Sequence, residues 1–172
     1  PKKYLKEFLN SSFFSKLRDV FGDITISDEE NLGYGNIYWR LVRPNKSEDV
    51  GPLHRDSWFW ELNKEFPRPD YPFMRIKVWI AIATEIDKNG LLVEKNSHKR
   101  SDINWEGKLK HGIMKPILLD DKKCFNMNLV KTFPGECIIF NDELIHGGSI
   151  NLGTKTRVST EFTLLKRISN DF

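Results

Sequence analysis

Two histidines and an aspartate stand in an order that could hold a metal ion. His54 and Asp56 flank a single residue in the stretch GPLHRDSWFWELN, and His146 follows a run of β-formers and precedes two glycines. Two histidines and one carboxylate form the facial triad of non-haem Fe(II) oxygenases, which leaves other metal positions open. Taken alone, an H-x-D tripeptide is more often a charged surface turn, and a lone histidine at a strand end is more often bonded to a backbone carbonyl.

An arginine on the next predicted strand favours the metal site. Arg157 comes eleven residues after His146, and Ser159 lies two residues further on, hence on the same strand face. An arginine fork binds a carboxylate bidentately, and a neighbouring hydroxyl adds a hydrogen bond. A 2-oxoacid can chelate iron through its keto and carboxylate oxygens while its far carboxylate meets Arg157. The other histidines, His98 and His111, lie in polar sequence, and we expect them to be exposed.

The elements that must position these residues are mostly strands. Segments 2–10 and 11–21 have apolar residues at helical spacing, with Ser11 or Ser12 as a cap and Gly22 as an end, which predicts an N-terminal helical cover. Four runs are rich in β-formers, at residues 36–43, 74–83, 136–140 and 156–165. Segment 95–127 is polar and reads as a long insertion between strands that faces the substrate. Strands without crossover helices between them favour a mainly β, antiparallel sandwich or jelly roll.

Three of these strands pair an apolar face with a polar one. Either the polar faces lie in water, or they line the mouth of a barrel around a polar ligand while the apolar faces pack under the helices. The second arrangement would bring cations and aromatic side chains together near the site. The candidate substrate residues are Arg40, Arg75, Lys77 and Trp58, and the other reading of them is surface charge and a packed aromatic cluster.

Composition fits one globular domain. The chain has 172 residues, of which 39% are hydrophobic and 30% charged, and its net charge of +3 does not by itself indicate a nucleic-acid partner. No segment has the length of a membrane span or the pattern of a signal peptide. The two cysteines form no framework, so we expect free thiols in a reducing, cytoplasmic setting.

The same residues resemble the phytanoyl-CoA dioxygenase-like (PhyH) family of Fe(II)/2-oxoglutarate oxygenases. The segments VWIAIATEIDKNGLLVEKNSHK (78–99) and TFPGECIIFNDELIHGGSINLGTKTRVS (132–159) are similar to its strand, turn, distal-histidine and distal-arginine motifs, and the resemblance covers about residues 32–165. Two features depart from the family pattern. Lys95 and Asn96 replace the usual Pro-Gly, and the chain is short for the family.

The resemblance implies a single domain over residues 1–172, with a helical cover at 1–30 and a double-stranded β-helix core at 32–165. It implies that His54, Asp56 and His146 bind Fe(II). Residues expected at the 2-oxoglutarate site are Arg157, Ser159, Trp79, Tyr38 and Asn36.

The implied activity is hydroxylation of a C–H bond in a small polar or anionic molecule, using O₂ and releasing succinate and CO₂. A carboxylate at position 56 favours hydroxylation over halogenation, which needs a small residue there. Two alternatives stay open: a cupin-like metal protein or isomerase that does not use 2-oxoglutarate, and a non-catalytic jelly-roll binding module. We expect a small-molecule partner, with no nucleic acid and no membrane.

Overall fold

The computed structural model describes residues 2–110 and 112–168. Its helices are α1 (Lys2–Leu9), α2 (Ser12–Phe21) and α3 (Asp56–Leu62), and its 3-10 turns are η1 (Ser47–Asp49), η2 (Ser97–Lys99) and η3 (Lys122–Cys124). The strands are β1 (Ile24–Ile26), β2 (Tyr38–Val42), β3 (Phe73–Ala83), β4 (Leu91–Glu94), β5 (Trp105–Lys110), β6 (Ile113–Leu118), β7 (Met127–Val130), β8 (Cys137–Asn141), β9 (His146–Gly148) and β10 (Arg157–Arg167).

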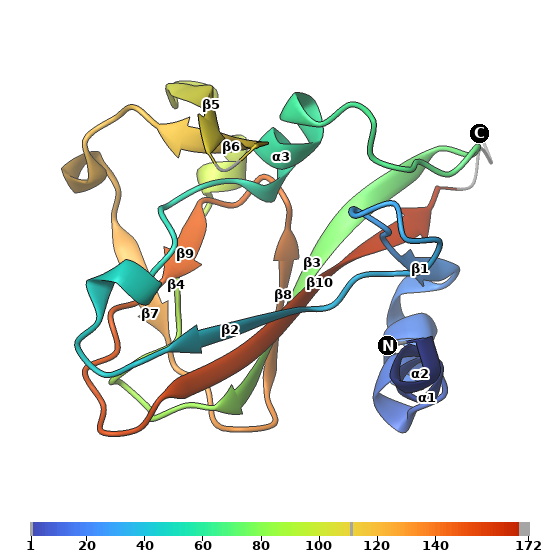
Figure 1. Cartoon of the computed structure of the whole chain (residues 1–172), viewed down its shortest axis with the longest axis horizontal. Coiled ribbons are helices and arrows are strands. Elements are labelled where there is room, and N and C mark those ends of the chain that lie inside the picture. The colour runs from blue at the N-terminus through green and yellow to red at the C-terminus, as the bar shows by residue number, and fades with distance from the viewer. Residues whose placement is uncertain (1, 111, 169–172) are drawn as a thin grey trace.

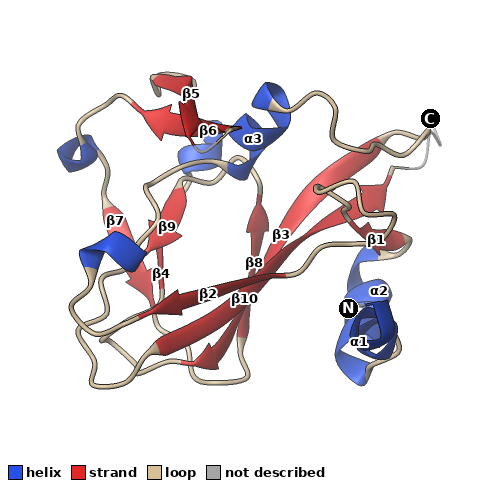
Figure 2. Cartoon of the chain, in the orientation of Figure 1, coloured by secondary structure: helices blue, strands red, loops and turns tan. Residues whose placement is uncertain are grey.

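The strands form two facing sheets and a separate hairpin. The major sheet has the order β1-β10-β3-β8, with β2 also paired to β10, and the minor sheet has the order β7-β4-β9. Every pair of these strands is antiparallel, as is the β5–β6 hairpin. Figure 1 shows the minor sheet on one side of the long strands β3 and β10, and α1 and α2 on the other. Figure 2 shows how little of the chain is helical outside that N-terminal pair.

The N-terminal helices form where the sequence predicts them. Ser11 caps α2, because its Oγ accepts a hydrogen bond from the Phe14 N–H at 3.2 Å. Gly22 ends the helix with a φ of 78°, a conformation that glycine adopts without steric cost, and its N–H donates to the Arg18 carbonyl at 2.8 Å. The predicted cap and stop are confirmed.

These helices cover the apolar face of the major sheet. Phe14 and Leu17 of α2 pack against a cluster that includes Val78 of β3 and Phe162 of β10, and both of these sheet residues are fully buried. Burial of each such side chain contributes roughly 1.5–3 kcal/mol. The opposite, polar face of the same strands therefore turns inward, toward the minor sheet. The structure has the second of the two arrangements expected for the strand faces.

The four predicted strands are confirmed, and the elements that the sequence did not reveal are short. Segment 95–127, predicted as a polar insertion, contains η2, the β5–β6 hairpin and η3. The hairpin packs on α3 at Gly107, where a Cβ would overlap the Leu62 side chain. The hairpin is therefore held against the helix that begins at Asp56.

Within the described residues, no helix is long and apolar enough to cross a membrane. Cys124 is exposed and Cys137 is half-buried, and both are free, as expected.

Candidate metal centre

The candidate metal ligands come from two chain segments that are paired by backbone hydrogen bonds. His54 and His146 form an isolated antiparallel bridge, with each N–H donating to the other residue's carbonyl at 3.0 Å. Asp56 is the first residue of α3, where the Ser57 N–H donates to the Asp142 carbonyl at 3.1 Å. Sequence positions nearly a hundred residues apart are thus held at a fixed separation by main-chain geometry.

The three side chains converge. One ligand atom from each of His54, Asp56 and His146 lies within 4.8 Å of the other two. The Asp56 carboxylate is 3.8 Å from His54 Nε2 through Oδ1 and 3.4 Å from His146 Nε2 through Oδ2. The other ring nitrogens face carbonyl oxygens: His54 Nδ1 lies 2.8 Å from Pro52 O, and His146 Nδ1 lies 2.9 Å from Leu144 O. A proton on each Nδ1 satisfies those contacts and leaves each Nε2 lone pair free to bind a metal.

The electrostatics keep the carboxylate ionised. Burial alone would raise the pKa of Asp56, but Lys77, His146 and His54 outweigh it and hold that pKa well below its usual value. The Lys77 ammonium is the nearest of these groups, with its Nζ 3.2 Å from Asp56 Oδ1. Burial lowers the pKa of His146 to about 4, which keeps this imidazole neutral near pH 7. Burial also lowers the pKa of His54, but Asp56 reverses this and leaves it raised.

The site therefore fits Fe(II). Among the described residues, Asp56 Oδ2 is a buried acceptor with no hydrogen-bond partner, although such atoms are normally satisfied. Together with two Nε2 atoms it completes the two-histidine, one-carboxylate donor set of a non-haem iron centre.

Beside the triad lies a group of side chains suited to binding a ligand carboxylate, and we call this group, Arg157, Ser159 and Trp79, the cradle. Arg157 is 3% exposed, donates from Nη1 to the Gly90 carbonyl at 2.6 Å and lies over the Trp79 ring at 6.0 Å from its centroid. Its Nε and the fully buried Ser159 Oγ find no partner among the described residues. A Cβ on Gly148 would lie 3.4 Å from Arg157 Nη2, so the absent side chain leaves room in front of the guanidinium. These groups suit the distal carboxylate of a 2-oxoacid.

The triad and the cradle open into one cavity of about 560 Å³, a size that suits a small ligand. Most of the predicted site residues line it: His54, Asp56, His146, Arg157, Trp79, Tyr38, Arg40 and Lys77.

Four predicted residues are not among those lining this cavity. Ser159 is fully buried on the same strand face as Arg157. Asn36 is buried, and its Oδ1 accepts from the Glu30 N–H at 2.9 Å. Arg75 pairs with Asp142 and lies over the ring of Trp60, which lines the cavity, without lining it itself. Trp58 is 2% exposed and stacks on Trp105, with ring centroids 5.0 Å apart. Asn36, Arg75 and Trp58 therefore take no part in the site that we propose.

The cavity also has lining residues that sequence reasoning missed. Glu161 shares the strand face of Arg157 and Ser159, so alternation could have indicated it. Glu29 follows β1 in an irregular loop, and Lys115 lies on the β5–β6 hairpin, where no pattern pointed inward. Phe59 of α3 completes an aromatic wall, with its ring 5.5 Å from the His54 ring. His98, expected to be exposed, is exposed, and His111 lies outside the described residues.

A family model described as phytanoyl-CoA dioxygenase (PhyH) matches residues 5–159. No curated protein matches the sequence. EvdO2 from Micromonospora carbonacea var. aurantiaca, solved with 2-oxoglutarate, is similar in structure with a TM-score of 0.65 at 15% identity, covering 99% of this chain and 67% of that one. AviO1 from Streptomyces viridochromogenes Tue57 has a TM-score of 0.57 at 14% identity, covering 92% of this chain and 59% of that one. EctD from S. alaskensis, solved with 2-oxoglutarate and 5-hydroxyectoine, has a TM-score of 0.56 at 16% identity, covering 86% of this chain and 46% of that one.

At these identities the structural matches show the fold, and the expected double-stranded β-helix with outer N-terminal helices is confirmed. The chain spans about two thirds of the length of EvdO2, and less of the other two proteins.

Proposed function

This chain belongs to the phytanoyl-CoA dioxygenase (PhyH) family of Fe(II)/2-oxoglutarate oxygenases, and on that premise we propose that it hydroxylates a C–H bond of a small polar molecule. The observation that most strongly supports this is a set of buried polar atoms at the cavity that have no hydrogen-bond partner among the described residues. Asp56 Oδ2 lies 3.4 Å from His146 Nε2 within the triad, and the other two atoms are Arg157 Nε and Ser159 Oγ, on one face of β10. One set fits the iron and the other fits the far carboxylate of 2-oxoglutarate.

When bound, iron and 2-oxoglutarate supply the oxidation, consuming O₂ and releasing succinate and CO₂. The protein's part is to hold and shield the reacting groups. The carbonyls of Pro52 and Leu144 fix the orientation of both imidazoles, and Lys77 keeps Asp56 ionised. With iron bound, Asp56 would fill the place that a halide would need, which favours hydroxylation.

The co-substrate end of the cavity is built to recognise a dicarboxylate. Arg157 offers two N–H groups in one plane, and the Trp79 ring below it prevents the guanidinium from turning away. The contact from Nη1 to the Gly90 carbonyl fixes the remaining freedom of the side chain. A preorganised fork loses little side-chain entropy when the carboxylate binds.

The rest of the cavity indicates the substrate. Beyond the metal ligands its wall includes Phe59, Trp60 and the carboxylates of Glu29 and Glu161. Glu161 is paired with Arg40 at 2.8 Å, whereas no ion pair between described residues involves Glu29, and burial raises the pKa of its carboxyl group. We therefore propose a substrate that brings hydrogen-bond donors, such as hydroxyl or ammonium groups, to Glu29 and an apolar face to the aromatic wall. A purely anionic molecule would meet Glu29 unfavourably.

The test is formation of succinate from 2-oxoglutarate by the iron-loaded protein under O₂. Wild-type protein should produce succinate slowly alone and faster with a true substrate, and polyols and amino compounds are the first classes to screen. Asp56→Ala should produce none. Equal succinate formation by wild type and Asp56→Ala would overturn the proposal.

A further inference from the structure

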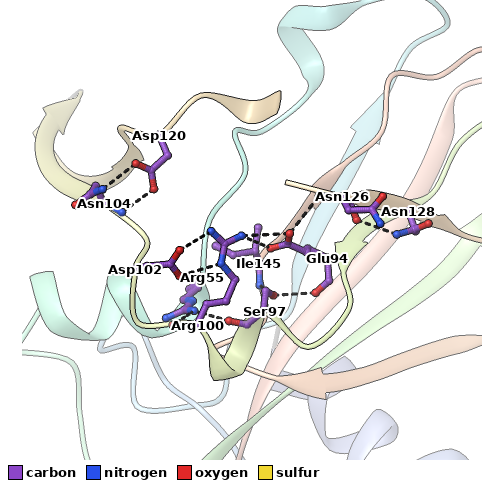
Figure 3. A network of polar contacts seen from close by, with 10 residues as sticks. All are labelled: Arg55, Glu94, Ser97, Arg100, Asp102, Asn104, Asp120, Asn126, Asn128 and Ile145. Carbon is purple, nitrogen blue, oxygen red and sulfur yellow. Dashed lines mark hydrogen bonds and ion pairs between the residues drawn. The ribbon is translucent and has the colours of Figure 1, made fainter. Parts of the chain in front are cut away.

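We propose that Arg55 is a positioning residue that couples the metal ligands to segment 95–127, so that metal binding and the order of that segment depend on each other. This inference rests on the metal site of the proposed function. It concerns a side chain that neither binds the metal nor lines the cavity. Arg55 stands between His54 and Asp56 in the sequence, yet it does not line the cavity, and its side chain lies in a separate polar network with Ser97 and Arg100 (Figure 3).

The guanidinium of Arg55 holds two otherwise separate turns. It is 8% exposed, and its Nη2 donates to the Ser97 carbonyl at 2.5 Å and to the Arg100 carbonyl at 2.7 Å. These carbonyls lie at the start of η2 and just beyond its end. From the other side, Nη1 donates to Glu143 Oε2 at 3.2 Å, in the turn that leads into β9. One buried side chain thus ties the H-x-D segment to η2 and to the approach of His146.

Ser97 adds a direct link to the second histidine. Its Oγ accepts a hydrogen bond from the Ile145 N–H at 2.7 Å and donates to the Glu94 carbonyl at 2.8 Å. Ile145 immediately precedes His146 and is fully buried, so its N–H has no access to water. Arg55 therefore donates hydrogen bonds to the same turn that positions the main chain of His146.

The network continues from η2 to the base of the β5–β6 hairpin. Arg100 pairs with Glu94 at 3.1 Å and with Asp102 at 3.0 Å, and Glu94 Oε1 also accepts from the Asn126 N–H at 3.1 Å. Two residues after Asp102, the Asn104 N–H and side-chain amide both donate to the Asp120 carboxylate at 2.8 Å, which closes the hairpin base.

The hairpin in turn forms part of the cavity wall. Lys115 and Pro116 of β6 line the cavity. A loosened hairpin would therefore change both the metal geometry, through Ser97 and Arg55, and access to the metal. Allosteric coupling of this kind is reciprocal: if the metal orders the segment, the ordered segment raises metal affinity by the same factor.

The test compares hydrogen exchange and metal affinity in the full chain, with Co(II) or Fe(II) alone as the probe under anaerobic conditions. In wild type, metal should slow exchange at amides that report on the network, namely Asn104, Leu119, Asn126 and Ile145. In Arg55→Met the metal should still bind, with affinity reduced by roughly 10- to 100-fold as for other residues that orient ligands. Its binding should no longer protect those amides. Arg167→Met, at the exposed end of β10, is the matched control and should behave as wild type.

Arg55→Lys separates positioning from charge. A lysine keeps the charge but cannot reach both carbonyls and Glu143 with a planar fork, so it should resemble Arg55→Met rather than restore coupling. Ser97→Ala gives an independent route if Arg55→Met fails to fold, and it should lose protection at Ile145 first. Undiminished metal protection of the four amides in the folded variants would overturn the inference. So would a wild-type protein that binds metal without protecting them. A protein that binds metal and shows the coupling but ignores 2-oxoglutarate would retain this inference while the proposed function failed.

Discussion

The Nζ of Lys77 lies 3.2 Å from Oδ1 of Asp56, and both side chains are buried in the wall of the metal site. This pair leaves Oδ2 of the same carboxylate unpartnered among the described residues and directed toward His146. Burial would lower the pKa of Lys77, but Asp56, Glu161 and Glu29 together raise it above its ordinary value. Lys77 therefore stays charged. When no metal is bound, it supplies part of the positive charge that the metal ion would provide beside Asp56.

Lys77→Met should destabilise the metal-free protein by about 3 kcal/mol, because removing one partner of a buried pair leaves the other charge uncompensated. Divalent metal supplies the missing charge, so metal should raise the melting temperature of the variant more than that of wild type. Thermal unfolding with and without Ni(II) measures both effects. Lys115→Met, which removes a more exposed cavity lysine, is the control. An equal metal-induced shift in Lys77→Met and wild type would contradict the role given to Lys77.

Gly148→Ala should weaken 2-oxoglutarate binding roughly tenfold, a loss of about 1.4 kcal/mol, while metal affinity stays unchanged. The new Cβ would lie 3.4 Å from Arg157 Nη2, in the space that the co-substrate carboxylate needs. Gly51→Ala is a matched control, because Gly51 also lines the cavity and a Cβ there would meet no described atom within 4 Å. The KM for 2-oxoglutarate in the succinate assay is the measurement. A similar rise in this KM in both variants would mean that the effect does not arise from crowding of Arg157.

Acidification should destabilise the metal-free protein through His146. Burial depresses its pKa from 6.5 to about 4, so the neutral imidazole contributes stability that is fully present above pH 6.5 and is lost as pH falls toward 4. His54 has a raised pKa and acts in the opposite sense, so its contribution is present at low pH and is lost as pH rises. The free energy of unfolding, measured with urea at several pH values, should fall less steeply from pH 6.5 to 4 in His146→Gln than in wild type. The same pH dependence in both proteins would mean that His146 takes up its proton in the folded protein.

Asn151→Ala should destabilise the fold by about 3 kcal/mol or more, since it leaves several buried groups without partners. The Asn151 side chain is fully buried, donates to the carbonyls of Val42 and Lys155 at 2.8 Å, and accepts from Asn89 Nδ2 at 2.8 Å. Asn128→Ala, which removes a single exposed bond to the Asn126 carbonyl, should cost less than 1 kcal/mol. Chemical denaturation measures the free energy of unfolding that each variant loses relative to wild type. Equal losses in the two variants would refute the importance of the buried network.

Much of the fold was predictable, because the long strands have clear alternation and the helices have clear periodicity and caps. Alternation also placed Lys77, Trp79 and Arg157 on inward faces correctly. It failed for Arg75, which shares the face of Lys77 but lies about 7 Å further along the strand, outside the cavity. Alternation along a strand shows which face a residue lies on, but it does not show where along the strand the cavity ends.

The rest of the site depends on short elements and tertiary contacts that leave no local pattern. Helix α3 has seven residues, too few for a periodic signal, and successive residues on it point about 100° apart. Trp58 therefore packs into the core on Trp105 while Phe59 faces the cavity. Glu29 approaches from a loop after β1, and the contacts of Arg55 join residues more than forty positions apart. No single-sequence pattern could place these residues.

The most direct test of the account is an anaerobic titration of the Fe(II)-loaded protein with 2-oxoglutarate, followed by visible absorption. Chelation of the 2-oxoacid by iron should give a saturable metal-to-ligand charge-transfer band in wild type. The band should need a much higher 2-oxoglutarate concentration in Arg157→Ala and be absent in Asp56→Ala. Iron that binds to the wild-type protein but gives no band with 2-oxoglutarate would contradict the co-substrate site and with it the proposed activity.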